Sequence, residues 1–243
     1  MKTSISAIIY GIAIIVSSAF LGKAYVERSE TQGKIQVTGL GKTDFVSDLI
    51  VWGGSFNVIN KELKNAYAEL RKNKEIIKEY LKDRGIADDE IVFKAVSVND
   101  EAKSLYSNDG KYIGQEFVGF RLTQSIEIES KQVEKLEKIS REITELLNKG
   151  IQFYSETPRY FYTKLSDLKI AMISKATEDA RIRAENIASF SKGKLGKLES
   201  AKMGVFQITG QNSKDSYSWG GTFNTTSKEK TASITIKLTY KTD

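Results

Sequence analysis

The stretch AMISKATEDARIRAENIASFSKGKLGKLESA, residues 171–201, decides the fold because it runs from an alanine-rich helical pattern into a strand pattern. Its alanines recur at spacings of five, four, four and four residues. Small side chains along one helical face let the helix backbone lie close to a sheet or to another helix. We therefore expect a helix over residues 167–190 that packs within its own fold, with packing against another subunit as the alternative. The alanines are Ala171 and the candidate packing residues Ala176, Ala180, Ala184 and Ala188.

Upstream of this helix, the chain alternates between strand and helix patterns. Asp48 marks a turn between two strands, and Gly85 is a natural stop for the helix that precedes it. A tyrosine-bearing stretch with an Asp-Gly turn, residues 102–114, predicts a long hairpin. The expected elements are strands at residues 34–46 and 49–59, a helix at 60–85, and strands at 91–100 and 115–130.

The second half of the chain repeats this mixture of element types. A helix is expected at residues 133–147, and a strand at 151–163 is broken by Pro158. After the alanine-rich helix, a strand pair or bent strand (194–209) leads through a polar loop (210–230) to the last strand (231–242).

These patterns predict an α+β fold made of two mixed α/β subdomains, with mainly antiparallel sheets and long packing helices. We place the first subdomain at residues 34–129 and the second at 130–243, together forming one module. Residues 24–33 are expected to be a linker, and residues 1–23 an N-terminal membrane anchor or signal segment.

The N-terminal segment carries an uncharged run, TSISAIIYGIAIIVSSAFLG, at residues 3–22. As a helix it would extend about 30 Å, enough to cross the apolar core of a bilayer. A cleaved signal peptide, with a small-residue site near Ser17-Ser18-Ala19, is the alternative. We favour a retained anchor in the inner membrane with the folded module in the periplasm. Cleavage would instead release the module to the periplasm or the outer membrane.

The composition excludes several classes of catalytic site. The chain contains no cysteine and no histidine, so catalytic triads, thiolate nucleophiles, Cys-ligated zinc and HExxH metal sites are impossible. The net charge of +6 is a mild basic excess that reads as spread along the chain. It allows only a weakly specified attraction to anionic membranes or envelope polymers.

Two short motifs could suggest ligand binding, but each has a simpler interpretation. The GLGK at residues 39–42 lacks the loop spacing and the following helix of a phosphate-binding loop, so the glycines favour a bulge or a close crossing. The acidic Asp88-Asp89-Glu90 follows a helix stop, where acids usually cap or solvate a loop. We expect no catalytic residue, cofactor, metal ion or nucleic acid, and we predict that the protein is not an enzyme. Catalysis by carboxylates or lysine is the alternative that the composition leaves open.

The two tryptophans of the chain both lie in the pattern W-G-G-[ST]-F. Their flanking residues do not match, so we interpret the repetition as coincidence. Trp52 lies within a strand and is expected in the core or on a sheet face. Trp219 lies in a polar loop, where an exposed tryptophan is a common contact hot spot, unless it folds back over its own sheet.

Four stretches in this order resemble the SIMPL-domain family of bacterial periplasmic and outer-membrane immunogenic envelope proteins. They are IQVTGLGKTDFVSD (35–48), LKDRGIADDEI (81–91), the opening stretch at 171–201, and ASITIKLTY (232–240). The resemblance covers roughly residues 34–241. It implies a non-enzymatic envelope protein, in a family with members linked to oxidative-stress tolerance and a branch that forms large ring-shaped homo-oligomers. The lysine-rich character and the insertion at 102–114 depart from that pattern.

The expected function is structural: an anchored extracytoplasmic module that assembles with copies of itself in a structural or envelope-stress role. The candidate oligomer contacts are Trp219, Phe223, Tyr106 and Tyr112. The membrane is the expected second partner, through residues 3–22. A monomeric periplasmic module that binds envelope ligands, through the tyrosine-rich YSETPRYFY at residues 154–162, is the alternative.

Overall fold

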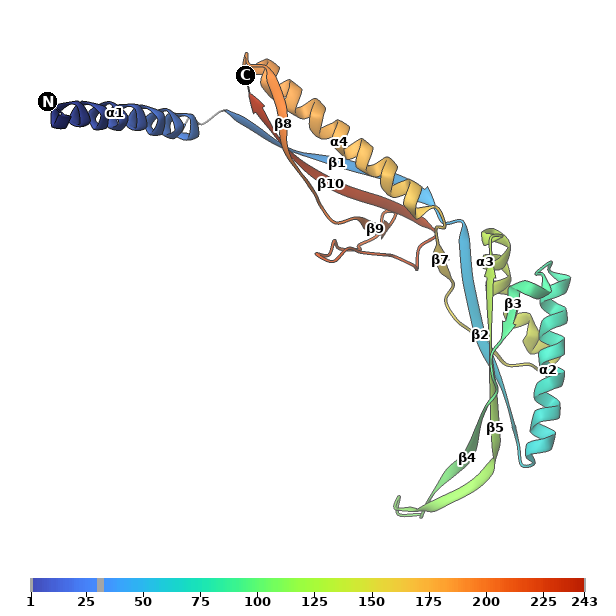
Figure 1. The fold of residues 1–243 in the computed structure, drawn as a ribbon. Helices are drawn as coiled ribbons and strands as arrows, with labels where there is room; N and C mark the ends of the chain where they lie inside the picture. The colour runs from blue at the N-terminus through green and yellow to red at the C-terminus, as the bar shows by residue number, and fades with distance from the viewer. Residues whose placement is uncertain (1, 30–32, 243) are drawn as a thin grey trace. The chain divides into compact units, whose positions relative to one another are not determined.

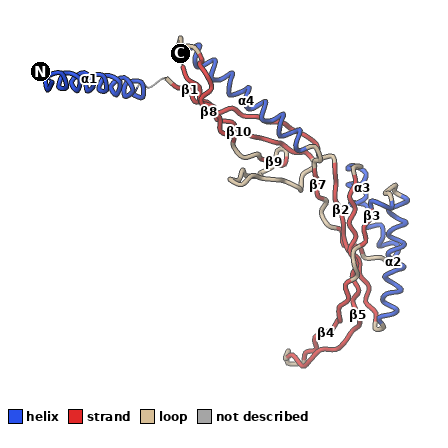
Figure 2. The backbone as a smooth tube through the Cα atoms, viewed as in Figure 1, coloured by secondary structure: helices blue, strands red, loops and turns tan. Residues whose placement is uncertain are grey.

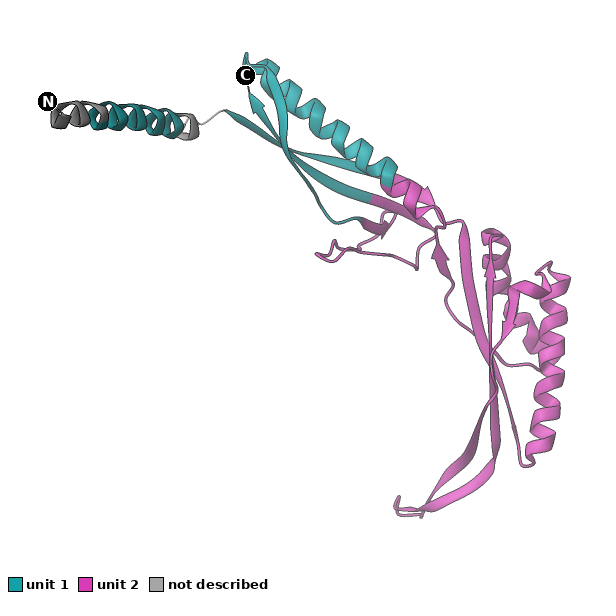
Figure 3. Cartoon of the chain, viewed as in Figure 1, with its two compact units in different colours: residues 1–42, 170–206, 233–243 teal, residues 43–169, 207–232 magenta. Residues whose placement is uncertain are grey.

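The structure of the protein, a computed structural model, describes residues 2–29 and 33–242, with side chains for 10–26 and 33–242. It is an α+β fold of helices and antiparallel sheets (Figure 2), as the sequence patterns predict. The chain divides into two compact units that are each discontinuous in sequence (Figure 3). Unit 1 comprises residues 1–42, 170–206 and 233–243, and unit 2 comprises residues 43–169 and 207–232. These boundaries differ from the two consecutive subdomains that the element order suggested.

The N-terminal helix α1 extends over Lys2–Ser29 and so includes the first part of the stretch expected to be a linker. The predicted membrane segment, residues 3–22, lies partly outside the residues whose side chains are described. Among the described residues, no helix has the length and apolar character needed to span a membrane.

The first sheet contains both the first and the last strand of the folded module, side by side (Figure 1). Its strand order is β1 (Lys34–Val46), β10 (Glu229–Thr242), β8 (Leu195–Met203), and β9 (Gln207–Gly210) also pairs with β10. The Thr242 amide donates to the Gly33 carbonyl and the Ser47 amide donates to the Lys228 carbonyl, so β1 and β10 run antiparallel. The expected strand pair at 194–209 is therefore two strands that both attach to the last strand.

Helix α4 (Leu165–Phe190) packs on this sheet through a row of small residues. A Cβ added at Gly39 would lie 2.1 Å from the Ala176 carbonyl oxygen, and one at Gly41 would lie 2.4 Å from the Met172 carbonyl oxygen. The glycines of GLGK thus allow a close approach, but of a helix rather than a strand. The fifth member of the buried row is Met172, because Ala171 is exposed; with Met172, every spacing in the row is four residues.

The second sheet lies in unit 2 and has the order β3-β5-β2-β6, with β4 also pairing β5 and β7 also pairing β2. All of these pairs are antiparallel. The strands are β2 (Leu49–Asn60), β3 (Ile91–Phe93), β4 (Ser97–Tyr106), β5 (Tyr112–Ser130), β6 (Phe153–Ser155) and β7 (Arg159–Phe161). The break predicted at Pro158 separates β6 from β7.

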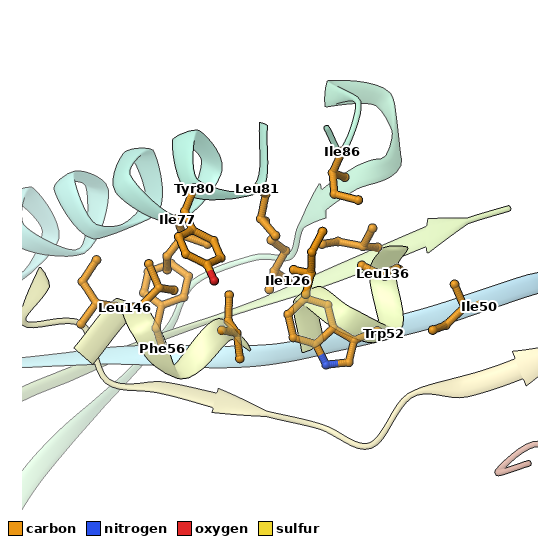
Figure 4. Packing of buried hydrophobic residues seen from close by; sticks show 14 of the residues in the cluster. Ile50, Trp52, Phe56, Ile77, Tyr80, Leu81, Ile86, Ile126, Leu136 and Leu146 are labelled. Carbon is orange, nitrogen blue, oxygen red and sulfur yellow. The ribbon is translucent and has the colours of Figure 1, made fainter. Parts of the chain in front are cut away.

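Helices α2 (Leu63–Asp83) and α3 (Val133–Glu142) contribute to the hydrophobic core of this unit (Figure 4). Gly85, with φ of +78°, follows α2, as predicted from its position after the helical pattern. Short 3₁₀ turns cover Asp88–Glu90 and Ile143–Lys149, so the helix expected at 133–147 is α-helical only to Glu142.

Trp52 lies at the centre of this core, as its strand alternation predicts. Its side chain is 1% exposed, and its ring lies 5.8 Å from the ring of Phe153. The indole Nε1 donates to the Ser155 hydroxyl and to the Glu156 carbonyl, each at 3.1 Å, so the polar atom of a buried indole is satisfied.

Candidate interaction surface

The β4–β5 hairpin projects beyond the core of unit 2 (Figure 1). Tyr106 and Tyr112 lie next to its turn. Its turn is closed by the Ser107 amide, which donates to the Lys111 carbonyl at 2.8 Å, and by Gly110 with φ of +76°. Tyr106 and Tyr112 are direct cross-strand partners, and their rings meet edge to face with centroids 6.0 Å apart. The structure thus brings together the two residues that were singled out from the sequence.

The hairpin is exposed along most of its length. Tyr106 is 63% exposed and Tyr112 is 58% exposed, and a second aromatic pair, Phe117 and Phe120, has centroids 5.2 Å apart. Sequence reasoning missed four further exposed apolar residues there: Val98, Ile113, Phe117 and Val118. A signal for three of them existed in two adjacent apolar pairs, Tyr112-Ile113 and Phe117-Val118. Such pairs break strict alternation, as expected of a two-stranded ribbon that covers neither face.

The loop between β9 and β10, residues 211–228, presents the second tryptophan to solvent and is called the Trp219 loop below. Trp219 is 100% exposed, so it does not fold back over the sheet, and Tyr217 and Phe223 beside it are also exposed. This loop and the tip of the hairpin lie at separate places in unit 2 (Figure 3). Phe223 and Ile208 form an isolated bridge, which fixes the outgoing end of the loop.

The polar side chains of Gln207, which is buried, and Asp215, which is exposed, hold this loop in one shape. The Gln207 amide nitrogen donates to the Ser218 carbonyl, and its carbonyl oxygen accepts from the Thr222 amide, both at 2.8 Å. The Asp215 carboxylate accepts from the Gly210 amide and from the Asn224 side chain. The hydrogen bond from Gly210 holds the pKa of Asp215 below its usual range.

Lys230 anchors the base of the loop from the interior of unit 2. Its side chain is 2% exposed, and its Nζ donates to the Tyr160 carbonyl at 3.0 Å and to the Asn224 carbonyl at 2.6 Å. Burial lowers the pKa of Lys230 to about 8, against the opposing effect of the Asp215 charge. The sequence contained a signal for the burial of Lys230, because it lies two and four residues before Ala232 and Ile234, which are buried on the same face of the strand.

The candidate packing alanines lie in unit 1. Ala176, Ala180, Ala184 and Ala188 are all buried against their own fold. Beside them, Asp179 accepts a hydrogen bond from the Leu40 amide at 2.8 Å, which holds the pKa of its carboxyl below the usual range. The Glu178, Arg181 and Glu185 side chains form the ion pairs that their three- and four-residue spacing predicts.

Other groups with shifted pKa values form contacts within the fold. Burial raises the pKa of Tyr80 to about 12, and its hydroxyl donates to the Glu142 carbonyl at 2.9 Å. Asp88 pairs with Lys78 and Lys82. No group of three or more acidic side chains that could hold a metal ion occurs within residues 10–26 and 33–242.

The tyrosine-rich stretch at 154–162 does not form one open aromatic surface. Tyr160 is buried, and the ring of Tyr162 lies against that of Phe45 with centroids 4.8 Å apart. Tyr154 is the exposed ring of this stretch. The hairpin tip and the Trp219 loop therefore offer more open aromatic surface than the stretch proposed for ligand binding.

Comparison with known proteins identifies a family whose model matches this chain. The family model for SIMPL, described as "Protein of unknown function (DUF541)", matches residues 35–240. A search of curated proteins found no match. Since the matched region covers nearly all of the folded module, the chain belongs to the SIMPL family.

Proposed function

We propose that this protein is a non-enzymatic structural module that assembles with copies of itself. The hairpin residues Tyr106 and Tyr112 and the loop residues Trp219 and Phe223 are its contacts. The exposed aromatic hairpin is the observation that carries the proposal. A two-stranded ribbon in water is marginally stable by itself, and covering it against a second copy removes its apolar side chains from water.

The rigid Trp219 loop supports the same function. Because Gln207, Asp215 and Lys230 already order the loop, little conformational entropy remains to be lost when the indole is buried. Exposed tryptophan and tyrosine residues on ordered surfaces are typical of contact hot spots.

The arrangement of the two surfaces favours a head-to-tail contact. The hairpin and the loop are different in shape and lie at separate places in unit 2 (Figure 3). When the hairpin of one copy binds the loop of the next, an open chain of copies leaves one hairpin uncovered at one end and one loop uncovered at the other. Closure of the chain into a ring covers both surfaces. The proposed setting is the periplasm, with residues 3–22 as the inner-membrane anchor and a role in envelope structure or stress.

The test is the mass of the detergent-solubilised full-length protein, measured by light scattering during size exclusion. A defined multiple of the 27.2 kDa chain is expected. Trp219→Ala and the double variant Tyr106→Ala/Tyr112→Ala should each reduce this mass. Tyr67→Ala is the matched control, since Tyr67 is 55% exposed on α2, outside both surfaces, and should leave the mass unchanged. A monomeric wild-type protein would overturn self-assembly and favour the monomeric binding module.

A further inference from the structure

The basic excess of the chain is concentrated in one unit. Residues 33–42, 170–206 and 233–242, the folded part of unit 1, contain eleven basic and four acidic residues, a net charge of +7. Unit 2 contains 23 basic and 24 acidic residues, a net charge of −1. The fold therefore gathers into unit 1 a charge that looks evenly spread along the sequence.

Much of this charge lies on one face of the first sheet. Buried residues alternate with exposed ones in β1 from Lys34 to Lys42, and in β10 from Ile234 onward. The buried Gly39 and Gly41 contact α4. Helix α4 runs along β1 and β10 (Figure 1), so the exposed positions point away from it. The lysine face consists of Lys34 and Lys42 in β1, Lys202 in β8, and Lys237 and Lys241 in β10, all exposed.

Lysines on this face stand directly opposite one another across strands. Lys237 is the register partner of Lys202. The Thr242 to Gly33 hydrogen bond and the Gln36 to Thr239 contact place Lys34 opposite Lys241. Like charges in this position are mildly destabilising, and an anionic partner would offset the repulsion.

The acidic residues of unit 1 leave most of the lysine face without a counter-charge. Glu199 pairs with Lys34 at 2.7 Å. The other three acids pair with arginines of α4 itself. Among the described side chains, no carboxylate forms an ion pair with Lys42, Lys202, Lys237 or Lys241.

The remaining exposed residues of the face suit lipid headgroups. Thr38, Thr235 and Gln36 supply hydroxyl and amide donors for phosphate oxygens, and Leu40 is an exposed apolar residue. None of the exposed positions within residues 34–42 and 233–242 carries an aromatic side chain. Proteins typically bind single-stranded nucleic acids by stacking the bases on aromatic rings, so this face is poorly suited to them. Eleven residues, 23–33, separate the uncharged run at 3–22 from Lys34, and the first seven of them belong to α1.

We propose that the lysine face of the first sheet binds the headgroups of an anionic phospholipid bilayer. This interaction is separate from self-assembly and from insertion of the N-terminal segment. Each lysine near an anionic surface contributes about a fivefold gain in partition, so three together amount to on the order of a hundredfold. The gain falls at high salt because mobile ions screen exposed charges.

The first test compares the binding of the full-length protein to vesicles of phosphatidylcholine with and without phosphatidylglycerol. The ratio of the two partition coefficients cancels the apolar insertion of the N-terminal segment. The response of its own charges, Lys2, Lys23 and Arg28, cancels when the ratio of a variant is compared with that of the wild type. Lys202→Gln/Lys237→Gln/Lys241→Gln should lower this ratio on the order of a hundredfold. The matched control Lys64→Gln/Lys72→Gln/Lys131→Gln removes three exposed lysines of unit 2 and should leave the ratio unchanged.

Three outcomes would overturn the proposal: a wild-type ratio near one, equal ratios for the two triple variants, or a ratio that persists at high salt. Tighter binding to duplex DNA than to anionic vesicles, with the same dependence on the three lysines, would reassign the face to nucleic acid. Acylation of the wild-type lysines, read by mass spectrometry, gives a test without substitutions. Anionic vesicles should slow acylation at Lys202, Lys237 and Lys241 but not at Lys64 or Lys72, and equal rates at both sets would contradict lipid binding.

Discussion

Gly39 and Gly41 determine how closely α4 lies on the first sheet. A Cβ at Gly39 would lie within 2.7 Å of three atoms of Ala176 and Ala180, two of them backbone atoms that cannot turn aside. The strand therefore needs a glycine where the helix needs an alanine. This pairing explains why two motifs far apart in the sequence are both made of small residues.

Gly39→Ala should destabilise unit 1 by about 3 kcal/mol, because the added methyl group forces α4 away from β1. Urea unfolding followed by circular dichroism measures the change. Gly220→Ala is the control, since its nearest neighbour, the Ser218 hydroxyl, lies 3.9 Å from the added Cβ. Equal stabilities of the two variants would show that α4 can shift without cost.

Lys230 should make stability depend on pH in a specific window. Its pKa is about 8 in the folded protein against 10.5 ordinarily, so between these pH values the unfolded chain binds more protons. The free energy of unfolding of the wild type, relative to Lys230→Met, should therefore rise from pH 8 to pH 10.5, by on the order of 3 kcal/mol. Chemical unfolding across this range is the measurement. A difference that stays flat would mean that the buried amine titrates normally.

The β4–β5 hairpin is the element whose environment should change most on assembly. From Gly119 to the turn, β5 pairs only with β4, because its pairing with β2 begins at Phe120. Register shifts at Glu101/Ala102 and Leu105/Tyr106 also interrupt the pairing of β4 with β5. Such a ribbon opens locally at low free-energy cost, so its amides exchange readily with solvent when it is uncovered.

Hydrogen exchange of residues 102–118 should be slower in the assembled wild type than in the smaller species formed by Trp219→Ala. The amides of β2 provide an internal reference, because this strand is central in its sheet in either state. Unchanged exchange in the hairpin would exclude it from the contact, whatever mass the protein has.

At the scale of the whole molecule, the roles proposed for the N-terminal segment and for the folded module can be tested separately. The proposed contacts all lie in unit 2, whereas residues 1–23 belong to unit 1. A chain that begins at Ala24 should therefore keep the number of subunits of the full-length protein, as measured by light scattering. If the shorter chain is a monomer and the full-length chain is not, association comes from the N-terminal segment and Trp219 is not a contact.

Much of the fold could be predicted from local patterns. Alternation along residues 34–46 and 231–242 identified both partner strands, and the Asp-Gly turn identified the hairpin. The candidate surface was predictable in part: Tyr106 and Tyr112 follow from the hairpin, and Trp219 from its polar loop. The polar network of Gln207, Asp215 and Lys230 could not be predicted, because its partners depend on how the loop closes.

The sequence by itself determined the element types and their order, the exclusion of histidine and cysteine chemistry, and the family. These properties depend on composition and on short-range periodicity, which reports whether each position faces a core. Only the tertiary structure decided that the first and last strands pair, that Met172 rather than Ala171 completes the buried row, and that lysines from three strands share one face. The physical reason is that strand pairing is a contact between distant segments, so the neighbours of a side chain across the sheet are set by chain closure and not by local sequence.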